Sequence, residues 1–180
     1  STIPAPDLRW CGAEFQDDSF YLKSTEREAQ RLVDHFGCTS KSHVLDIGCG
    51  QGRLPIGLLR VLGTCTYTGM DVDADSIKWC SDYIQATNPS CRFIHIDVHN
   101  ERYNTRGDKL GENFKFDLDD NSVDIIFLYS VFSHMYDYNM KIYLDEFGRI
   151  LSDNGKVFFT TFVEENVPDF ENNPQNYEHN

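Results

Sequence analysis

Short apolar runs alternate along the chain with stretches in which apolar residues recur at helical spacing. Each apolar run is bounded by polar or turn-forming residues, as expected for a buried strand. Because strands and helices alternate, the pattern predicts an α/β fold with a doubly wound, mostly parallel sheet and helices on both faces. Five strands are expected, at residues 44–47, 65–71, 92–97, 123–129 and 156–162.

Capping residues mark the first helix of this pattern. Thr25 and Glu28 form a T-x-x-E capping box, and Gly37 stands where a C-cap is expected. The helix is therefore predicted to begin near Thr25 and to end at Gly37. The later helices are expected from Leu54 onward and over residues 75–87 and 138–151.

The composition divides the chain into three parts. Its 180 residues are enough for one domain with a hydrophobic core. Residues 1–24 form an N-terminal arm with many apolar side chains, which either packs on the domain or covers its binding site as a lid. Residues 25–163 form the domain, and the polar residues 164–180 form a tail. The long polar segment 99–121 is either a substrate-side insertion or surface elaboration.

The most informative stretch is Val44–Arg53, with the sequence VLDIGCGQGR. A strand passes through a glycine-rich turn into a helix, so the backbone can approach a ligand at the helix N-terminus. A dinucleotide fingerprint, G-x-G-x-x-G, would place its third glycine at position 53, but Arg53 stands there and the glycine falls at Gly52. This spacing resembles motif I of the class I S-adenosylmethionine (SAM)-dependent methyltransferases.

Two later segments carry the same resemblance. DDNSVDIIFLYSVFSHM, at residues 119–135, is similar to the fourth strand of that family, and YLDEFGRILSDNGKVFFTTF, at residues 143–162, to its fifth. The resemblance covers residues 25–163 and implies SAM as cofactor and S-adenosylhomocysteine (SAH) as product. The family usually continues into a sixth and a seventh strand. The chain is therefore expected to be a fragment, to be completed from elsewhere, or to have a minimal fold.

Acids at the ends of the next two strands fit the same cofactor. Asp71 lies about 20 residues beyond the glycine turn, where an acid can accept hydrogen bonds from both ribose hydroxyls. The resemblance implies that the Asp97 carboxylate binds the adenine amino group and that the Val98 N–H serves a ring nitrogen. The residues expected at the cofactor are Asp46, Gly48, Cys49, Gly50, Arg53, Asp71, Val72, Asp97, Val98, Ser130 and Tyr21, the last as a lid residue.

Charge restricts the partners. The formal net charge is −13 and no basic stripe is present, which disfavours nucleic acids and anionic membranes. No apolar run approaches the roughly 20 residues that span a bilayer, and residues 1–6 do not resemble a signal peptide. In methyltransferases that act on the amino groups of nucleobases, the fourth strand ends in an N-P-P-Y-type motif. The matching place in this chain is Tyr129–Phe132, with the sequence YSVF, which departs from that class. A cytoplasmic enzyme with a small-molecule acceptor is therefore expected.

The cysteines and histidines do not indicate a metal site. The six cysteines form no C-x-x-C motif and are expected to be reduced thiols. His95 and His99 would lie about 13 Å apart in a continuous strand, too far to share one zinc ion. No metal ligand is therefore predicted.

Methyl transfer from SAM is an in-line displacement in which positioning supplies much of the rate. His134, which follows the fourth strand, is the candidate base, or else a residue that orients the loop or packs on the cofactor. Residues that could line the acceptor side or contact the sulfonium by cation–π interaction are Asp137, Tyr136, Tyr129, Tyr21 and Phe132. The alternatives are a non-catalytic SAM-binding or partner-regulating domain and, disfavoured by the glycine spacing and by Asp97, a nicotinamide-dependent oxidoreductase.

Overall fold

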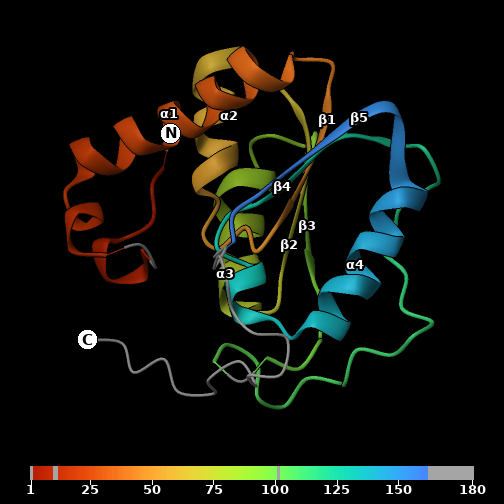
Figure 1. Ribbon diagram of the computed structural model, residues 1–180. Coiled ribbons are helices and arrows are strands. Elements are labelled where there is room, and N and C mark those ends of the chain that lie inside the picture. Colours follow the sequence, from red (N-terminus) through yellow and green to blue (C-terminus); the bar gives the residue numbers. More distant parts are fainter. Residues whose placement is uncertain (1, 10–11, 101, 162–180) are drawn as a thin grey trace, which may run out of the picture.

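The computed structural model describes residues 2–9, 12–100 and 102–161. Its helices and strands alternate as the hydrophobic pattern predicts, and Figure 1 shows their arrangement. The main elements in chain order are α1 (Asp18–Phe36), β1 (His43–Ile47), α2 (Arg53–Leu62), β2 (Thr66–Asp71), α3 (Ala74–Cys80), a π-helical turn (Ser81–Gln85), β3 (Cys91–His95), β4 (Val123–Leu128), α4 (Asp137–Ile150) and β5 (Leu151–Phe159). Short 3-10 helices at Pro6–Leu8, Ala13–Gln16 and Phe132–His134 complete the described chain.

The strands form one parallel sheet in the order β3-β2-β1-β4-β5. β1 lies at the centre because it pairs with both β2 and β4, and the strand order reverses on either side of it. In doubly wound sheets a ligand binds outside the carboxyl ends of the strands at such a switch point. The predicted fold class is therefore confirmed, and it places a binding site at the end of β1.

The sheet has a hydrophobic core on each face. Figure 1 shows α1 and α2 on one side of the sheet and α4 on the other. One core joins α1, α2 and α3 to side chains such as Tyr67 and Phe127, and the second joins α4 to Leu45, Ile126 and their neighbours. Close packing is possible in the first core because α2 carries Gly57. A Cβ there would stand 2.0 Å from the Thr25 carbonyl oxygen of α1.

Helix α1 begins earlier than predicted. Its N-cap is Asp17, whose carboxylate accepts a 2.7 Å hydrogen bond from the Phe20 N–H. Thr25 and Glu28, predicted to cap the helix, lie buried inside it, where the Thr25 hydroxyl donates to the Leu22 carbonyl. The helix start predicted from the capping box is therefore wrong. Thr25 and Glu28 do not cap the helix but are buried within it. The C-cap prediction is confirmed, with Gly37 at φ 73°.

Two other boundaries differ from the prediction. The third strand ends at His95 rather than Asp97. The Ile96 N–H still donates to the Asp71 carbonyl of β2, but the Val98 N–H then donates to the Ile96 carbonyl in a tight turn that takes the chain away from the sheet. His95 and His99 therefore do not share a strand. The fifth strand begins at Leu151, and its register against β4 shifts between Val123 and Ile125. The end of that predicted strand and the tail 164–180 lie outside the described residues.

The connection between β3 and β4, residues 96–122, carries no helix or strand in its described part. It crosses from the edge of the sheet to β4, and Phe116 fills the second core against α4, with ring centroids 5.1 Å from Tyr143 and 6.1 Å from Phe147. Aromatic side chains of the connection thus cover part of the sheet that a crossover helix would cover. In the described residues, no helix is long and apolar enough to span a membrane.

Candidate functional site

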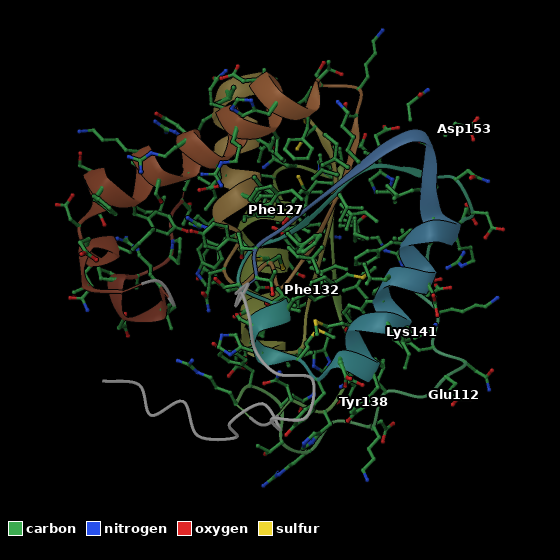
Figure 2. The ribbon with its side chains drawn as sticks, viewed as in Figure 1. Glu112, Phe127, Phe132, Tyr138, Lys141 and Asp153 are labelled. Carbon is green, nitrogen blue, oxygen red and sulfur yellow. The ribbon has the colours of Figure 1, made fainter. Side chains whose placement is uncertain are left out.

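A cavity of about 860 Å³ opens at the carboxyl ends of the strands. Figure 2 labels Phe132 and Tyr138 toward this end of the molecule and Asp153, near the start of β5, at the opposite end. We name one part of the cavity the glycine-turn half; its lining residues are Gly48, Cys49, Gly50, Gln51, Arg53, Asp46, Asp71 and, from the arm, Arg9, Phe15 and Tyr21. The tyrosine half consists of Tyr103, His134, Tyr136, Tyr138 and Asn139.

Three glycines give the turn after β1 its shape. Gly48, Gly50 and Gly52 have φ values of +75°, +49° and +75°, in the left-handed region that favours glycine. A Cβ at Gly48 would stand 2.5 Å from Val131, and one at Gly52 would stand 2.4 Å from Ile84. A Cβ at Gly50 would meet nothing within 4 Å. The outer glycines therefore pack against protein, whereas Gly50 faces open space in the cavity.

Asp71 fixes this turn from the end of β2. Its Oδ2 accepts a 2.7 Å hydrogen bond from the Gly50 N–H, and its Oδ1 accepts a 2.9 Å bond from the Asp73 N–H. Burial raises the pKa of this carboxyl above its usual value, and the hydrogen bonds from Asp73 and Gly50 oppose that rise. Asp71 lines the cavity where the sequence predicted a ribose-binding acid.

Asp46 is the most deeply buried acid of the site. Its Oδ2 accepts a 2.6 Å hydrogen bond from the Tyr67 hydroxyl. Burial raises the pKa of Asp46 to about 7, although the Tyr67 hydrogen bond and the Arg53 charge lower it. The carboxyl group of Asp46 therefore exchanges its proton near neutral pH.

The N-terminal arm closes the glycine-turn half. Tyr21, the predicted lid residue, is buried and lines the cavity. Arg9 holds the arm in place, since its guanidinium and Nε bond to the carbonyls of Pro4, Phe15 and Gln16 and lie 4.5 Å from the Tyr21 ring centroid. The sequence analysis did not single out Arg9, although it is one of only two cations in the arm, with Lys23.

Arg53 also lies in this half. Its guanidinium carbon stands 4.9 Å from the Tyr129 ring centroid and 5.7 Å from that of Phe15. The described residues include no carboxylate in a salt bridge with Arg53. The cavity therefore contains a half-buried cation that an anionic group of a ligand could pair with.

A chain of hydrogen bonds links the glycine turn to α3. Gln51 donates a 2.7 Å hydrogen bond from Nε2 to the Ser76 hydroxyl, and the Ser76 hydroxyl donates to the Asp73 carboxylate. The Asp73 carboxylate also caps α3 by accepting from the Ser76 N–H. This chain of contacts was missed because it depends on residues that only the fold brings together.

The predicted adenine contacts are not brought together in the structure. Asp97 does not line the cavity, and its Oδ1 accepts a 2.9 Å hydrogen bond from Asn104 Nδ2. Val98 does line it, but its N–H donates to the Ile96 carbonyl at 2.8 Å. β3 ends at His95, two residues before Asp97. The Asp97 carboxylate therefore faces the following loop, where Asn104 binds it, and not the cavity.

The remaining predicted site residues follow β4. Ser130 lines the cavity with a φ of +57°, which is unusual outside glycine, and its N–H donates to Thr160 Oγ1 at 2.7 Å. Such strained backbone is frequent at functional sites. Tyr129, Tyr136 and His134 also line the cavity. The other predicted residues of this segment do not line it: Phe132 packs on Phe159, and the Asp137 carboxylate accepts from the Tyr138 N–H.

Other residues predicted at the cofactor also line the cavity. The further predicted residues that line the cavity are Gly48, Cys49, Gly50 and Val72. Cys49 is a buried free thiol, as are Cys38, Cys65, Cys80 and Cys91 among the described cysteines. Burial raises the pKa of the Cys49 thiol well above its ordinary value. Cys49 therefore stays a protonated, buried thiol.

The first turns of the β3–β4 connection form the wall facing His134. Asn100 Oδ1 accepts hydrogen bonds of 3.0 Å from the N–H groups of Arg102 and Tyr103, and Asn100 and Asn104 bond each other through their backbones. The Tyr103 ring meets the His134 ring edge-on, with centroids 6.1 Å apart. The segment expected to be an insertion or surface elaboration therefore supplies part of the cavity wall.

Comparison with known families identifies the domain. Residues 44–155, more than half of the chain, match the family described as a methyltransferase domain. The parallel sheet and its helices match solved structures of the same kind. The chain therefore belongs to the class I SAM-dependent methyltransferase family, which confirms the resemblance of its motifs.

Individual relatives are more distant. The 235L protein of Invertebrate iridescent virus 6, named as a methyltransferase, is 29% identical over 91 residues, which are 51% of this chain and 31% of that protein. A SAM-dependent methyltransferase structure from Methanococcus maripaludis has a TM-score of 0.60 at 21% identity, over 77% of this chain and 56% of that one. Coclaurine N-methyltransferase bound to N-methylheliamine and SAH has a TM-score of 0.56 at 17% identity, over 85% of this chain and 40% of that one.

The chain is shorter than these relatives. It spans about a third of the length of the curated relatives that it matches, at 32% and 31%.

The residues present fit SAM. Gly50 leaves open space beside the backbone, Asp71 offers carboxylate oxygens at the end of β2, and Arg53 offers a cation. The rings of Tyr21 and Tyr129 line the same cavity, and aromatic faces attract cations such as a sulfonium. A volume of about 860 Å³ lies near the upper end of the range for small-molecule sites, so a cofactor and a second molecule have room together.

Proposed function

We propose that the chain transfers a methyl group from SAM to a small-molecule acceptor bound in the cavity. The observation that carries this proposal is the convergence of the glycine turn, Asp71 and a cavity of about 860 Å³ at the switch point of the sheet. SAM supplies an electrophilic methyl group on a sulfonium. The residues of the chain bind and orient both molecules and exclude water.

Each residue of the glycine-turn half has a place in this proposal. The Asp71 carboxylate accepts hydrogen bonds from the ribose hydroxyls, while its bonds to Gly50 and Asp73 keep the turn open. Arg53 pairs with the carboxylate of the methionine part. Tyr21 and Tyr129 present aromatic rings to the cation. Preorganised contacts of this kind can supply a large part of the rate of an in-line displacement.

A small acceptor is supported by the form and charge of the site. The cavity lies under the arm, which Arg9 fastens to the start of α1 through an ion pair with Asp18. The formal net charge of −13 opposes polyanionic substrates such as nucleic acids. These features favour a molecule that enters the cavity whole.

His134 is proposed as the group that receives the proton of the acceptor. It lines the tyrosine half, at the end of a short 3-10 helix after β4. Replacing His134 with alanine is expected to lower kcat more than tenfold with little change in the affinity for SAH. Equal losses in turnover and in SAH affinity would instead indicate an orienting role.

Calorimetric titration with SAH, with NAD titrated in parallel, tests the proposal. Micromolar binding of SAH and none of NAD is expected. Binding of NAD alone would overturn the proposal in favour of an oxidoreductase. Binding of SAH with no methyl transfer to any acceptor would support a non-catalytic SAM-binding domain.

A further inference from the structure

One buried polar atom in the cavity wall is left without a hydrogen-bond donor. The atom is Oδ1 of Asn139, in the first turn of α4, and it has no hydrogen-bond partner among the described residues. Glu28 Oε2 shares this property, but it lies 3.2 Å from the Arg31 guanidinium, which pairs with its charge. A buried carbonyl oxygen without a donor is unfavourable, and Asn139 lines the cavity. The oxygen therefore fits a ligand that donates an N–H or O–H.

The position of Asn139 along α4 relates it to the end of β2. Tyr143 follows it by four residues, so the two side chains lie on the same face of the helix. Tyr143 also lines the cavity, and it belongs to the same core cluster as Met70 of β2. Burial raises the pKa of the Tyr143 hydroxyl, and the negative charge of Asp71 adds to the rise. The face of α4 that carries Asn139 is therefore turned toward the strand that ends in Asp71.

Apolar residues line the cavity around the end of β2. Met70 and Val72 flank Asp71 in the sequence, and Ile96 and Val98 follow β3, the neighbour of β2 in the sheet. In SAM the adenine is attached to the ribose, so a ribose bound at Asp71 puts the base among these neighbouring residues. A purine has two apolar faces and a polar edge, and a ligand site typically combines apolar walls with a few placed polar groups. Adenine therefore fits between these side chains and the Asn139 amide.

The residues that the sequence predicted for the adenine are engaged within the protein. The Asp97 carboxylate does not line the cavity and accepts a 2.9 Å hydrogen bond from Asn104 Nδ2. The Val98 N–H donates to the Ile96 carbonyl at 2.8 Å. An asparagine amide carries an acceptor and a donor side by side, which match the N6 amino group of adenine and a neighbouring ring nitrogen. Asn139 therefore offers the pair of groups that Asp97 and Val98 direct elsewhere.

We propose that Asn139 recognises the adenine base of SAM, with Oδ1 accepting a hydrogen bond from the N6 amino group and Nδ2 donating to a neighbouring ring nitrogen. The assignment rests on the proposed methyltransferase function, and it gives to α4 the contact that the sequence predicted for Asp97. The base then lies at the border of the two halves of the cavity, between the ribose at Asp71 and the first turn of α4. Asn139 is a determinant of cofactor specificity and takes no part in the chemical step.

The test compares SAH with an SAH analogue in which hydrogen replaces the N6 amino group. Each is titrated into the full chain by calorimetry, so the measurement does not depend on the methyl acceptor. The unchanged protein should bind SAH at least tenfold more tightly than the analogue, because the analogue leaves Asn139 Oδ1 buried without a donor. Equal affinities for the two compounds would overturn the assignment. If neither compound binds, the proposed function is refuted and the assignment with it.

Variants of Asn139 connect the preference to this side chain. Asn139→Ala should bind SAH about tenfold more weakly and the analogue within about twofold of the unchanged protein, so that the preference disappears. Asn139→Asp keeps an acceptor oxygen and should keep a preference for SAH. A residue that only supports the fold would weaken the binding of both compounds alike, and that result in Asn139→Ala would contradict the assignment.

Asp97 provides the competing variant. Asp97→Ala should keep the preference for SAH, because its carboxylate is bonded to Asn104 rather than directed into the cavity. Asn154→Ala, at an exposed position of β5, is the matched control and should bind both compounds as the unchanged protein does. Loss of the preference in Asp97→Ala, with its retention in Asn139→Ala, would return the adenine contact to Asp97 and overturn the assignment.

Discussion

The two halves of the cavity are built in different ways. The glycine-turn half comes from the ends of adjacent strands, and its polar groups bond one another, as Asp71 does with the Gly50 N–H. The tyrosine half comes from a loop, a short helix and the first turn of α4, and it exposes aromatic rings and an unpartnered Asn139 oxygen. The half proposed to bind the cofactor is therefore built into the sheet, apart from the adenine contact proposed at Asn139, whereas the half proposed to bind the acceptor is made of connections that can vary without loss of the fold.

The largest expected effect is on the pH dependence of stability and concerns Asp46, which lies near the end of β1 and lines the cavity. Burial raises its pKa to about 7 in the folded protein, whereas the unfolded value lies near 4. The folded state therefore retains a proton that the unfolded state loses, so Asp46 reduces stability as the pH rises from about 4 to 7. A pKa difference of this size corresponds to roughly 4 kcal/mol.

Asp46→Asn should remove this part of the pH dependence, since asparagine can accept the Tyr67 hydroxyl and does not titrate. Urea unfolding at a series of pH values from 4 to 8 measures the slope. Asp82→Asn, an exposed residue paired with Lys78, is the control. The same slope in Asp46→Asn and in the unchanged protein would contradict the effect of burial on Asp46.

The next effect concerns the acid that orders the glycine turn. Asp71→Ala removes an acceptor from two backbone N–H groups and from the proposed ribose contact, so the affinity for SAH should fall about 100-fold, or roughly 3 kcal/mol. Calorimetry measures the affinity, and circular dichroism checks that the fold remains. Asp75→Ala, on the exposed side of α3, should bind SAH as the unchanged protein does. Unaltered affinity in Asp71→Ala would show that the cofactor lies elsewhere.

A smaller effect is expected in the loop that supports the tyrosine half. Asn104 Nδ2 donates to Asp97 Oδ1 and to the Val98 carbonyl, and so fastens the loop that carries Tyr103. Asn104→Ala should raise KM for the acceptor about fivefold, in line with roughly 1 kcal/mol for a net hydrogen bond, and leave SAH affinity within about twofold. Steady-state kinetics and calorimetry separate the two values. Thr105→Ala, exposed in the same loop, should behave as the unchanged protein; a loss of SAH affinity in Asn104→Ala would show that the halves are coupled.

The smallest effect lies outside both halves. Gly148 is exposed in α4, and a Cβ there would meet nothing within 4 Å. Gly148→Ala should stabilise the protein by about 0.5–1 kcal/mol through helix propensity, without a change in SAH affinity or turnover. Thermal unfolding measures the gain. A decrease in stability would indicate that α4 has a close neighbour that the described residues do not include.

The sequence predicted the glycine-turn half better than the tyrosine half, for a physical reason. Gly48, Gly50 and Gly52 are neighbours in sequence, and Asp71 ends the strand that pairs with β1, so local patterns determine their placement. Their roles at the cofactor stay predictions. Arg9 and Asn139 were missed because burial and contacts to distant segments, rather than local pattern, mark them as special.

Tertiary structure decides where two of the predicted features lie. Thr25 and Glu28 satisfy the local rule for a helix start, but Asp17 caps α1 and both residues lie buried inside the helix. Asp97 stands at the position of an adenine-binding acid, but the early end of β3 turns it to Asn104. In both cases contacts with residues outside the local pattern determine the position.

The most direct test of the account is a crystal structure of the chain with SAH. The account predicts the ribose at Asp71, the amino-acid part beside Gly50 and Arg53, the adenine amino group at Asn139 Oδ1, and the sulfur facing the tyrosine half with Tyr136 and Tyr138 still accessible. SAH that covers these two tyrosines, or that lies away from Asp71, would contradict the division of the cavity into a cofactor side and an acceptor side.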